Sequence, residues 1–221
     1  IGLVGSEMCI RDSSNTSYKY DLSFFREHPE LKERVSGGSV RYLSSSVFDK
    51  FPEVFYKSRP DDGDEYAEII GRQNNKRISY YFKTKYLNPP ENFVCYKVFI
   101  PSSNGSGALG EVLTTPLMGE PLMGHTETFI SFGKFDNIIE ASNLNKYVKT
   151  KFARIMLGSK KVTQGNKTPK IWSNVPLQDF TNNSDIDWSK SIPEIDKQLY
   201  AKYGLSEEEI NFIEQNVKPM E

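Results

Sequence analysis

The stretch from residue 124 to residue 179 constrains the fold most, because a strand-like pattern there runs directly into a strongly basic helical pattern. Residues 126–132 alternate in polarity with a period near two, which is typical of a strand. Residues 133–137 read as a turn. From Glu140 to Met156 the apolar residues recur at steps of three and four, which predicts an amphipathic helix.

This predicted helix and the loop after it carry most of the positive charge of the segment. Between Lys134 and Lys170 there are two acids, Asp136 and Glu140. The nine bases are Lys134, Lys146, Lys149, Lys151, Arg154, Lys160, Lys161, Lys167 and Lys170. Since the whole chain of 221 residues has a formal charge of −1, acids must gather elsewhere. Such segregation favours a local cationic face despite the neutral total.

The length and the cysteine content narrow the class of protein. A chain of 221 residues predicts one domain with or without a small appendage. Its two cysteines, Cys9 and Cys95, lie far apart and without partners at metal-ligand spacing. This pattern argues against a disulfide framework or a zinc site and favours a reducing cytoplasmic location. No stretch approaches the apolar length of a membrane span, so we expect no membrane partner.

The first thirteen residues do not read as the start of a fold or as a signal peptide. Residues 1–13 resemble a translated sequencing adapter, so we expect them, Cys9 included, to be non-native. On this interpretation the natural chain continues from a larger upstream protein.

Between residues 14 and 100 the sequence predicts two short helices followed by three strands. The helix candidates are residues 20–34 and 47–55, and the strand candidates are residues 66–70, 77–82 and 93–100. Three motifs here and just beyond are interpreted as structural rather than chemical. Residues 61–64 lack the closing glutamate of a calcium-binding loop. Asn88-Pro89-Pro90 is followed by Glu91, where the catalytic motif of an amino-group DNA methyltransferase has an aromatic ring. His125 is one of only two histidines in the sequence, so a metal site or catalytic triad built on it is not expected.

A glycine loop follows the last of these strands. Residues 102–110 contain three glycines, which would let backbone N–H groups approach a phosphate, but neither P-loop spacing nor a following Lys-Ser/Thr is present. We therefore predict that Asn104 and Gly105 contact a DNA backbone, with a plain linker as the equal alternative.

The last forty residues change to an acidic, helical character. Pro193 lies near the start of one predicted helix and Gly204 ends it, while Ser206 and Glu209 form the capping box of a second. From residue 181 onward nine acids stand against four bases, namely 185, 187, 194, 196, 207, 208, 209, 214 and 221 against 190, 197, 202 and 218. We expect this unit to lie away from any nucleic acid, because phosphate would repel it.

The chain from about Tyr96 to Met220 resembles the C-terminal target-recognition region of bacterial type II restriction–modification adenine-specific DNA methyltransferases. The segments that carry the resemblance are KVFIPSSNGSGALGE, GEPLMGHTETFISFGKFD, KYVKTKFARIMLG, KVTQGNKTPKIWSNVPLQDFT and SDIDWSKSIPEIDKQLYAKYGLSEEEI. The resemblance implies double-stranded DNA as a partner and an upstream methyltransferase domain on the same parent chain. That domain would bind S-adenosylmethionine and methylate adenine, and some relatives also carry a nuclease.

The basic residues support the same reading independently. Five of them are spaced to line one edge of the predicted helix and its C-terminal loop, where they would neutralise phosphates: Lys149, Lys151, Arg154, Lys160 and Lys161. In the next loop Gln164 and Asn166 are the candidates for base readout, because amides bind adenine bidentately in the major groove. A solvated lysine face is the alternative.

These observations predict an α/β fold with a mixed β-sheet, a long basic helix against it and a small C-terminal helical appendage. The predicted divisions are residues 14–180 for the recognition domain and 181–221 for the acidic appendage. We assign no catalytic residue, metal site or cofactor to the chain itself, and expect the S-adenosylmethionine chemistry to belong to the parent protein. The alternative function is a docking module that tethers a nuclease or second subunit through Trp172, Trp188 and the acidic tail.

Overall fold

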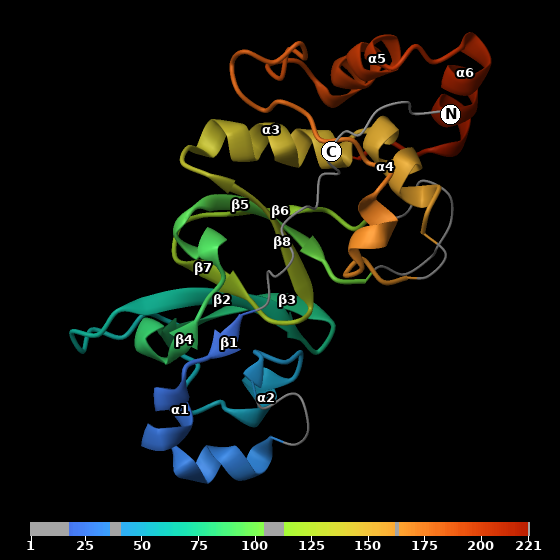
Figure 1. The fold of residues 1–221 in the computed structure, drawn as a ribbon. Helices are drawn as coiled ribbons and strands as arrows, with labels where there is room; N and C mark the ends of the chain where they lie inside the picture. The colour runs from blue at the N-terminus through green and yellow to red at the C-terminus, as the bar shows by residue number, and fades with distance from the viewer. Residues whose placement is uncertain (1–17, 36–40, 104–112, 162–163, 221) are drawn as a thin grey trace.

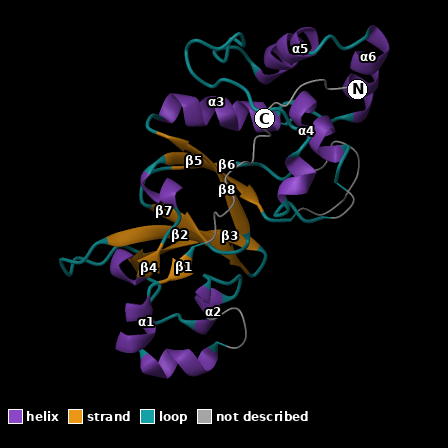
Figure 2. Cartoon of the chain, viewed as in Figure 1, coloured by secondary structure: helices purple, strands orange, loops and turns teal. Residues whose placement is uncertain are grey.

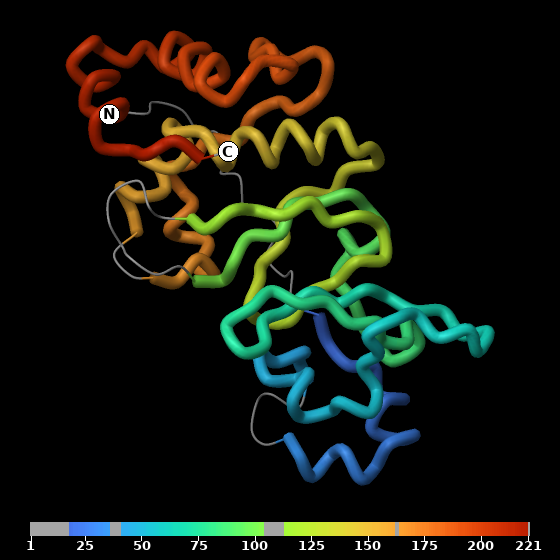
Figure 3. Tube along the Cα trace, turned by 180° about the vertical axis from the view of Figure 1, so that it is seen from behind, coloured from blue at the N-terminus to red at the C-terminus, as the bar shows by residue number. Residues whose placement is uncertain are grey.

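The computed structural model describes residues 18–35, 41–103, 113–161 and 164–220. Its elements follow one another in tiers, from the N-terminal helices through the β-sheets to two successive levels of C-terminal helices (Figure 1). The same order is seen from behind in Figure 3, where the acidic C-terminal helices again lie at the end opposite the N-terminal ones.

The first tier is helical. Helix α1 (Leu22–Glu27) begins after Asp21, whose carboxylate accepts the Ser23 N–H, and Pro29 opens a separate 3-10 helix, Pro29–Arg34. The single helix predicted over residues 20–34 is therefore two, because proline lacks the N–H that would continue α1. Helix α2 (Val47–Lys50) occupies part of the second predicted helix.

The strands form two three-stranded sheets and one short pair (Figure 2). In the first sheet, β2 (Tyr66–Gln73) pairs antiparallel with β3 (Lys76–Lys83) and parallel with β7 (Met123–His125). In the second sheet, β5 (Tyr96–Pro101) lies antiparallel between β6 (Leu117–Gly119) and β8 (Phe129–Phe135). The short pair is β1 (Lys19–Tyr20) with β4 (Leu87–Asn88). The α/β prediction is confirmed.

The strand predicted over residues 126–132 begins three residues later than expected, because residues 126–128 lie in the turn between β7 (Met123–His125) and β8 (Phe129–Phe135). Thr126 ends the parallel pairing of β7, its hydroxyl lies 2.8 Å from that of Thr128, and its carbonyl accepts the Phe129 N–H at 3.1 Å. Gly133, predicted as a turn, lies inside β8 with a φ of 86° that favours glycine. Only residues 129–132 of the alternating pattern are therefore strand, and β8 continues beyond them to Phe135.

The predicted long basic helix is also divided in two. Helix α3 (Ile138–Lys149) and helix α4 (Lys151–Gly158) meet at Thr150, which has the extended ψ of 150°. The Thr150 hydroxyl accepts the Ala153 N–H at 3.1 Å and donates to the Tyr147 carbonyl at 2.6 Å. Because this side chain caps α4 and ends α3 together, the apolar stripe continues while the helix axis does not.

Helices α5 (Ile192–Lys202) and α6 (Glu207–Asn216) form the last tier. Helix α6 begins with the predicted capping box of Ser206 and Glu209, and α5 begins with a capping box of Ser191 and Glu194 that was not predicted. Gly204 follows α5 with a φ of 62°, as a helix-ending glycine does. The hydrophobic core that α3 forms over β5 and β8 continues into this tier through Ile195, Leu199 and Ile213. A second core joins residues 18–93. The predicted division at residue 180 is therefore not a division of the core.

Candidate nucleic-acid interface

The structure brings together the two segments that were predicted to contact DNA. Ser103, at the start of the glycine loop, forms an isolated antiparallel bridge with Gly165. Beside it the Asn166 N–H donates to the Ser102 carbonyl at 2.8 Å. Asn104 and Gly105 lie outside the described residues, but the described base of their loop adjoins the Gln164 segment.

The structure corrects the prediction that Asn166 reads a base together with Gln164. Its side chain is fully buried and its amide nitrogen donates to the Pro101 carbonyl at 2.8 Å. Its own carbonyl accepts the indole N–H of Trp172 at 2.8 Å. A base edge cannot reach this side chain, because it joins the end of β5 to the core. Gln164 by contrast is exposed, and its role in base readout stays a prediction.

Several cations lie along the chain on either side of Gln164. Lys160, Lys167 and Lys170 are exposed, whereas Lys161 is half-buried. Burial lowers the pKa of the Lys161 ammonium to about 8, since a charged group loses hydration there. Lysines placed in this way can neutralise phosphates, and Lys161 would do so most strongly below pH 8.

The predicted phosphate contact of Lys151 is corrected by the structure, because the acidic tail already binds this side chain. Its ammonium donates to a Glu214 carboxylate oxygen at 2.5 Å and to the Glu214 carbonyl at 3.3 Å. The same carboxylate group accepts the Tyr200 hydroxyl at 2.9 Å. The sequence showed Lys151 as one of a row of bases, whereas packing of α6 against α4 pairs it internally.

Arg154 is likewise removed from the predicted phosphate contacts. Arg154 is only 2 % exposed, and its Nε donates to the carbonyls of Lys149 and Thr150. Its Nη2 donates to the Lys218 carbonyl at 2.5 Å. Burial lowers the pKa of the guanidinium, with Asp196 acting in the opposite direction. Arg154 therefore fastens the chain end to the junction of α3 and α4. Lys149 is half-buried, and its phosphate contact stays a prediction.

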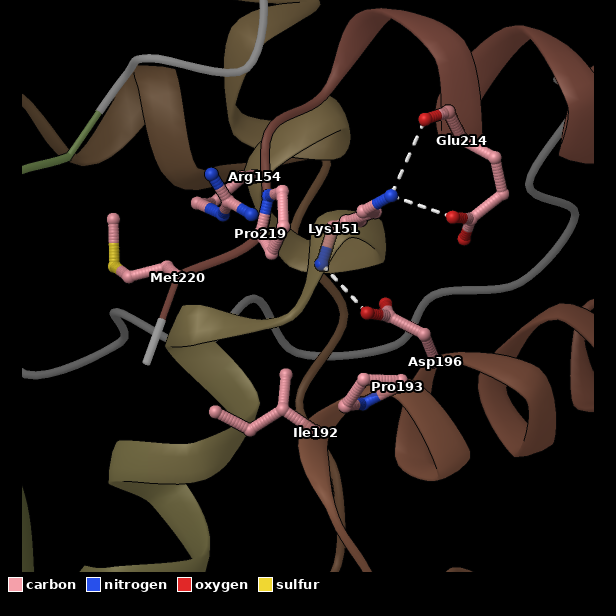
Figure 4. A pocket seen from close by; sticks show the side chains of 8 residues that line it. All are labelled: Lys151, Arg154, Ile192, Pro193, Asp196, Glu214, Pro219 and Met220. Carbon is pink, nitrogen blue, oxygen red and sulfur yellow. Dashed lines mark hydrogen bonds and ion pairs between the residues drawn. The ribbon is translucent and has the colours of Figure 1, made fainter.

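A pocket of about 430 Å³ lies where α4, α5 and the chain end meet (Figure 4). Asp196 lines it, and its carboxylate accepts the N–H groups of Lys151 and Phe152 at 3.0 and 2.9 Å. Burial raises the pKa of Asp196 to about 6, against the effect of those two hydrogen bonds. The carboxylate fills the position at the N-terminus of α4 where an anion would otherwise bind. The pocket is thus a structural junction between the basic and acidic parts of the chain.

Trp172 and Trp188 do not support the docking alternative. Their exposed fractions are 1 % and 5 %, and both indole N–H groups donate to backbone carbonyls, those of Asn166 and Asp179. Neither side chain is available to a partner, so the correction follows directly from burial. The acidic tail covers α3 and α4 rather than projecting away from them.

A buried polar cluster, which the sequence did not indicate, lies between the two sheets. The Lys97 ammonium is fully buried and donates to the carbonyls of Phe93, Cys95 and Glu120, and burial lowers its pKa to about 8. Burial also lowers the pKa of His125 to about 4, and its ring contacts the Thr126 carbonyl. The Lys97 contacts join β5 to the segments at Phe93 and Glu120, and the His125 ring lies 3.4 Å from the Ser131 hydroxyl of β8, which supports the structural interpretation of His125.

Within the described residues, no three or more His, Cys, Asp or Glu side chains come together as metal ligands would. None of the helices in those ranges combines the length and the apolar character that crossing a bilayer requires.

Comparison of this chain with protein-family models, with curated proteins and with solved structures finds no match.

Proposed function

We propose that this chain is a sequence-specific DNA-recognition module, which holds duplex DNA against the edge formed by Ser103, Gln164 and the lysines around them. The observation that carries the proposal is the bridge between Ser103 and Gly165. It places the base of the glycine loop beside an exposed amide and several exposed ammonium groups. Phosphate contacts from the lysines would fix the register, and Gln164 would read a base.

The distribution of charge supports this orientation. In Figure 1 the acidic helices α5 and α6 lie on one side of α4, and the segment that follows α4 lies on the other. The acids of the tail are therefore placed where they would not meet the phosphates, while Lys160, Lys167 and Lys170 remain exposed. Because electrostatic steering depends on local rather than total charge, a chain of charge −1 can still bind DNA through such an edge.

The sequence resemblance suggests the setting of this module. A parent restriction–modification protein in the cytoplasm would carry an adenine-specific methyltransferase domain with S-adenosylmethionine, and this chain would position the duplex for it. The chain itself would contribute recognition and no catalytic group. A docking module is the weaker candidate, since both tryptophans chosen for it are buried.

A salt titration of duplex binding tests the proposal. Fluorescence anisotropy of a labelled mixed-sequence duplex should show that the logarithm of the association constant falls linearly with the logarithm of the salt concentration. The slope should be about −0.9 for each phosphate neutralised. An absence of binding at low salt would overturn the proposal. Binding with a flat salt dependence would also contradict it, because contacts to phosphates cannot be independent of salt.

A further inference from the structure

The hairpin of β2 and β3 ends in a tight turn at Asn74 and Asn75. The strands are paired in register up to Gln73 opposite Lys76, with Asn74 and Asn75 alone forming the turn. Their φ angles are 50° and 60°, the positive values that a two-residue type I′ turn requires at both positions. Asparagine tolerates this conformation better than other side chains do. The tip is thus a short and well-defined two-stranded ribbon.

The tip is cationic and rich in amides. Residues 72–77 read RQNNKR, with three cations, three amides and no acid. All except Gln73 are exposed. Gln73 is held by neighbours, because its amide donates to Asp49 at 2.6 Å and accepts the Tyr80 hydroxyl at 2.9 Å. Asn74, Asn75 and Lys76 are the exposed residues at the end of the hairpin.

A series of contacts leads from this hairpin towards the edge formed by Ser103 and Gln164. Arg77 donates to the Thr115 carbonyl at 2.7 Å, and its guanidinium lies 6.0 Å from the centre of the Phe129 ring. Phe129 is paired with Pro101, which immediately precedes the residues that adjoin the Gln164 segment. Figures 1 and 3 both show the turn of the hairpin on the same side of the molecule as α4.

We propose that the tip of the β2–β3 hairpin enters the major groove of the same duplex, as a second reading element beside Gln164. Arg72 and Lys76 would neutralise phosphates on the groove walls, and the amides of Asn74 and Asn75 would meet base edges. This inference rests on the proposed DNA-recognition function. Arg77 acts as a positioning residue, since it fastens the hairpin to the segment before β6.

The dimensions of duplex DNA support this choice of partner. The major groove of B-form DNA is about 12 Å wide and admits a two-stranded ribbon. Asparagine amides pair bidentately with adenine there, so a tip that presents two of them has the chemistry to read sequence. The major groove of A-form RNA is too narrow for such an element, which makes double-stranded RNA the poorer partner.

The cationic part of the proposal is tested with a double variant, Arg72→Ala/Lys76→Ala. Its matched control is Arg26→Ala/Lys32→Ala, which removes the same charge from exposed positions on the N-terminal helices. Circular dichroism first establishes that both variants are folded. The hairpin variant should bind the mixed-sequence duplex more weakly than the control. Its binding should also depend less steeply on salt, by the amount expected for the loss of up to about two phosphate contacts. Equal slopes in the two folded variants would overturn the hairpin contact.

The reading part is tested with Asn74→Gly/Asn75→Gly. Glycine accepts the positive φ angles, so the turn is kept while both amides are lost. Selection of binding sites from a random duplex pool should give a recognition sequence that is relaxed at one or two positions relative to wild type. An unchanged sequence would overturn base reading by the tip.

The outcomes distinguish this inference from the function on which it rests. If the wild-type chain binds no duplex, the DNA-recognition function itself fails. The hairpin inference alone fails if wild type binds, the Arg72/Lys76 variant matches its control and the Asn74/Asn75 variant keeps the wild-type recognition sequence. Double-stranded RNA of the same length should compete poorly, and competition equal to that of DNA would overturn placement in the major groove.

Discussion

Arg154 and Lys218 are joined by a hydrogen bond of 2.5 Å from the guanidinium to the backbone carbonyl, which anchors the end of the described chain to the start of α4. Lys151 makes the neighbouring contact with Glu214. Two of the five bases that were predicted to contact phosphate therefore hold the acidic tail on α4. The candidate interface moves from the helix to the segment that follows it.

Replacing Arg154 by alanine should lower stability without changing DNA binding. Its removal leaves the buried Thr150 carbonyl and the part-buried carbonyls of Lys149 and Lys218 without this donor, which costs about 1–3 kcal/mol in the free energy of unfolding. Urea titration measures that loss. Lys160→Ala/Lys170→Ala is the counterpart, expected to keep stability and to reduce the salt slope of duplex binding by up to about two contacts. A reduced slope in folded Arg154→Ala would contradict the internal role.

The two amides near the Ser103–Gly165 bridge should fail in different ways. Asn166→Ala removes the buried hydrogen bond to Pro101 and should cost about 1–3 kcal/mol of stability. Gln164→Ala should leave stability unchanged and lower discrimination against a wrong base by about 1–3 kcal/mol. Thermal unfolding and competition between duplex variants measure these effects. Discrimination that persists in Gln164→Ala would place base reading elsewhere.

Duplex affinity should depend on pH through Lys161. Its pKa of about 8 means that the ammonium loses its proton as the pH rises toward 9, and phosphate binds only the charged form well. Affinity should therefore fall by up to about tenfold per pH unit above pH 8, the limit for one proton. Lys161→Arg stays charged and should lack this fall. Anisotropy titrations at matched salt measure duplex affinity against pH for wild type and Lys161→Arg. Parallel pH profiles for the two proteins would rule out Lys161 as the titrating contact.

Asp196 should make stability depend on pH in the acid range. Its pKa is raised to about 6 in the folded chain from 3.8, so the folded state holds the proton more tightly. The resulting stabilisation is complete below about pH 4 and is lost as the pH rises through about 6, an effect on the order of 3 kcal/mol. The difference in unfolding free energy between wild type and Asp196→Asn isolates this group from the other carboxylates. A difference that stays constant from pH 4 to pH 7 would contradict the raised pKa.

Local patterns in the sequence were enough to determine several elements. The predicted capping box of Ser206 and Glu209 begins α6, because its hydrogen bonds span only three residues. Aromatic and β-branched residues between turns that contain Asn and Pro identified β2, β3 and most of β5, which is also a local signal. The α/β class follows from these local signals.

Only the tertiary structure decided which polar groups face solvent. Lys151 and Lys160 look alike in the sequence, yet Lys151 is paired with Glu214 while Lys160 is exposed. Asn166 and Gln164 differ in the same way, since burial of Asn166 depends on Pro101 and Trp172. The division of the basic helix at Thr150 also depends on Asp196, which is distant in sequence. These outcomes rest on contacts between remote segments, and the sequence determines such contacts only through the packing of the whole chain.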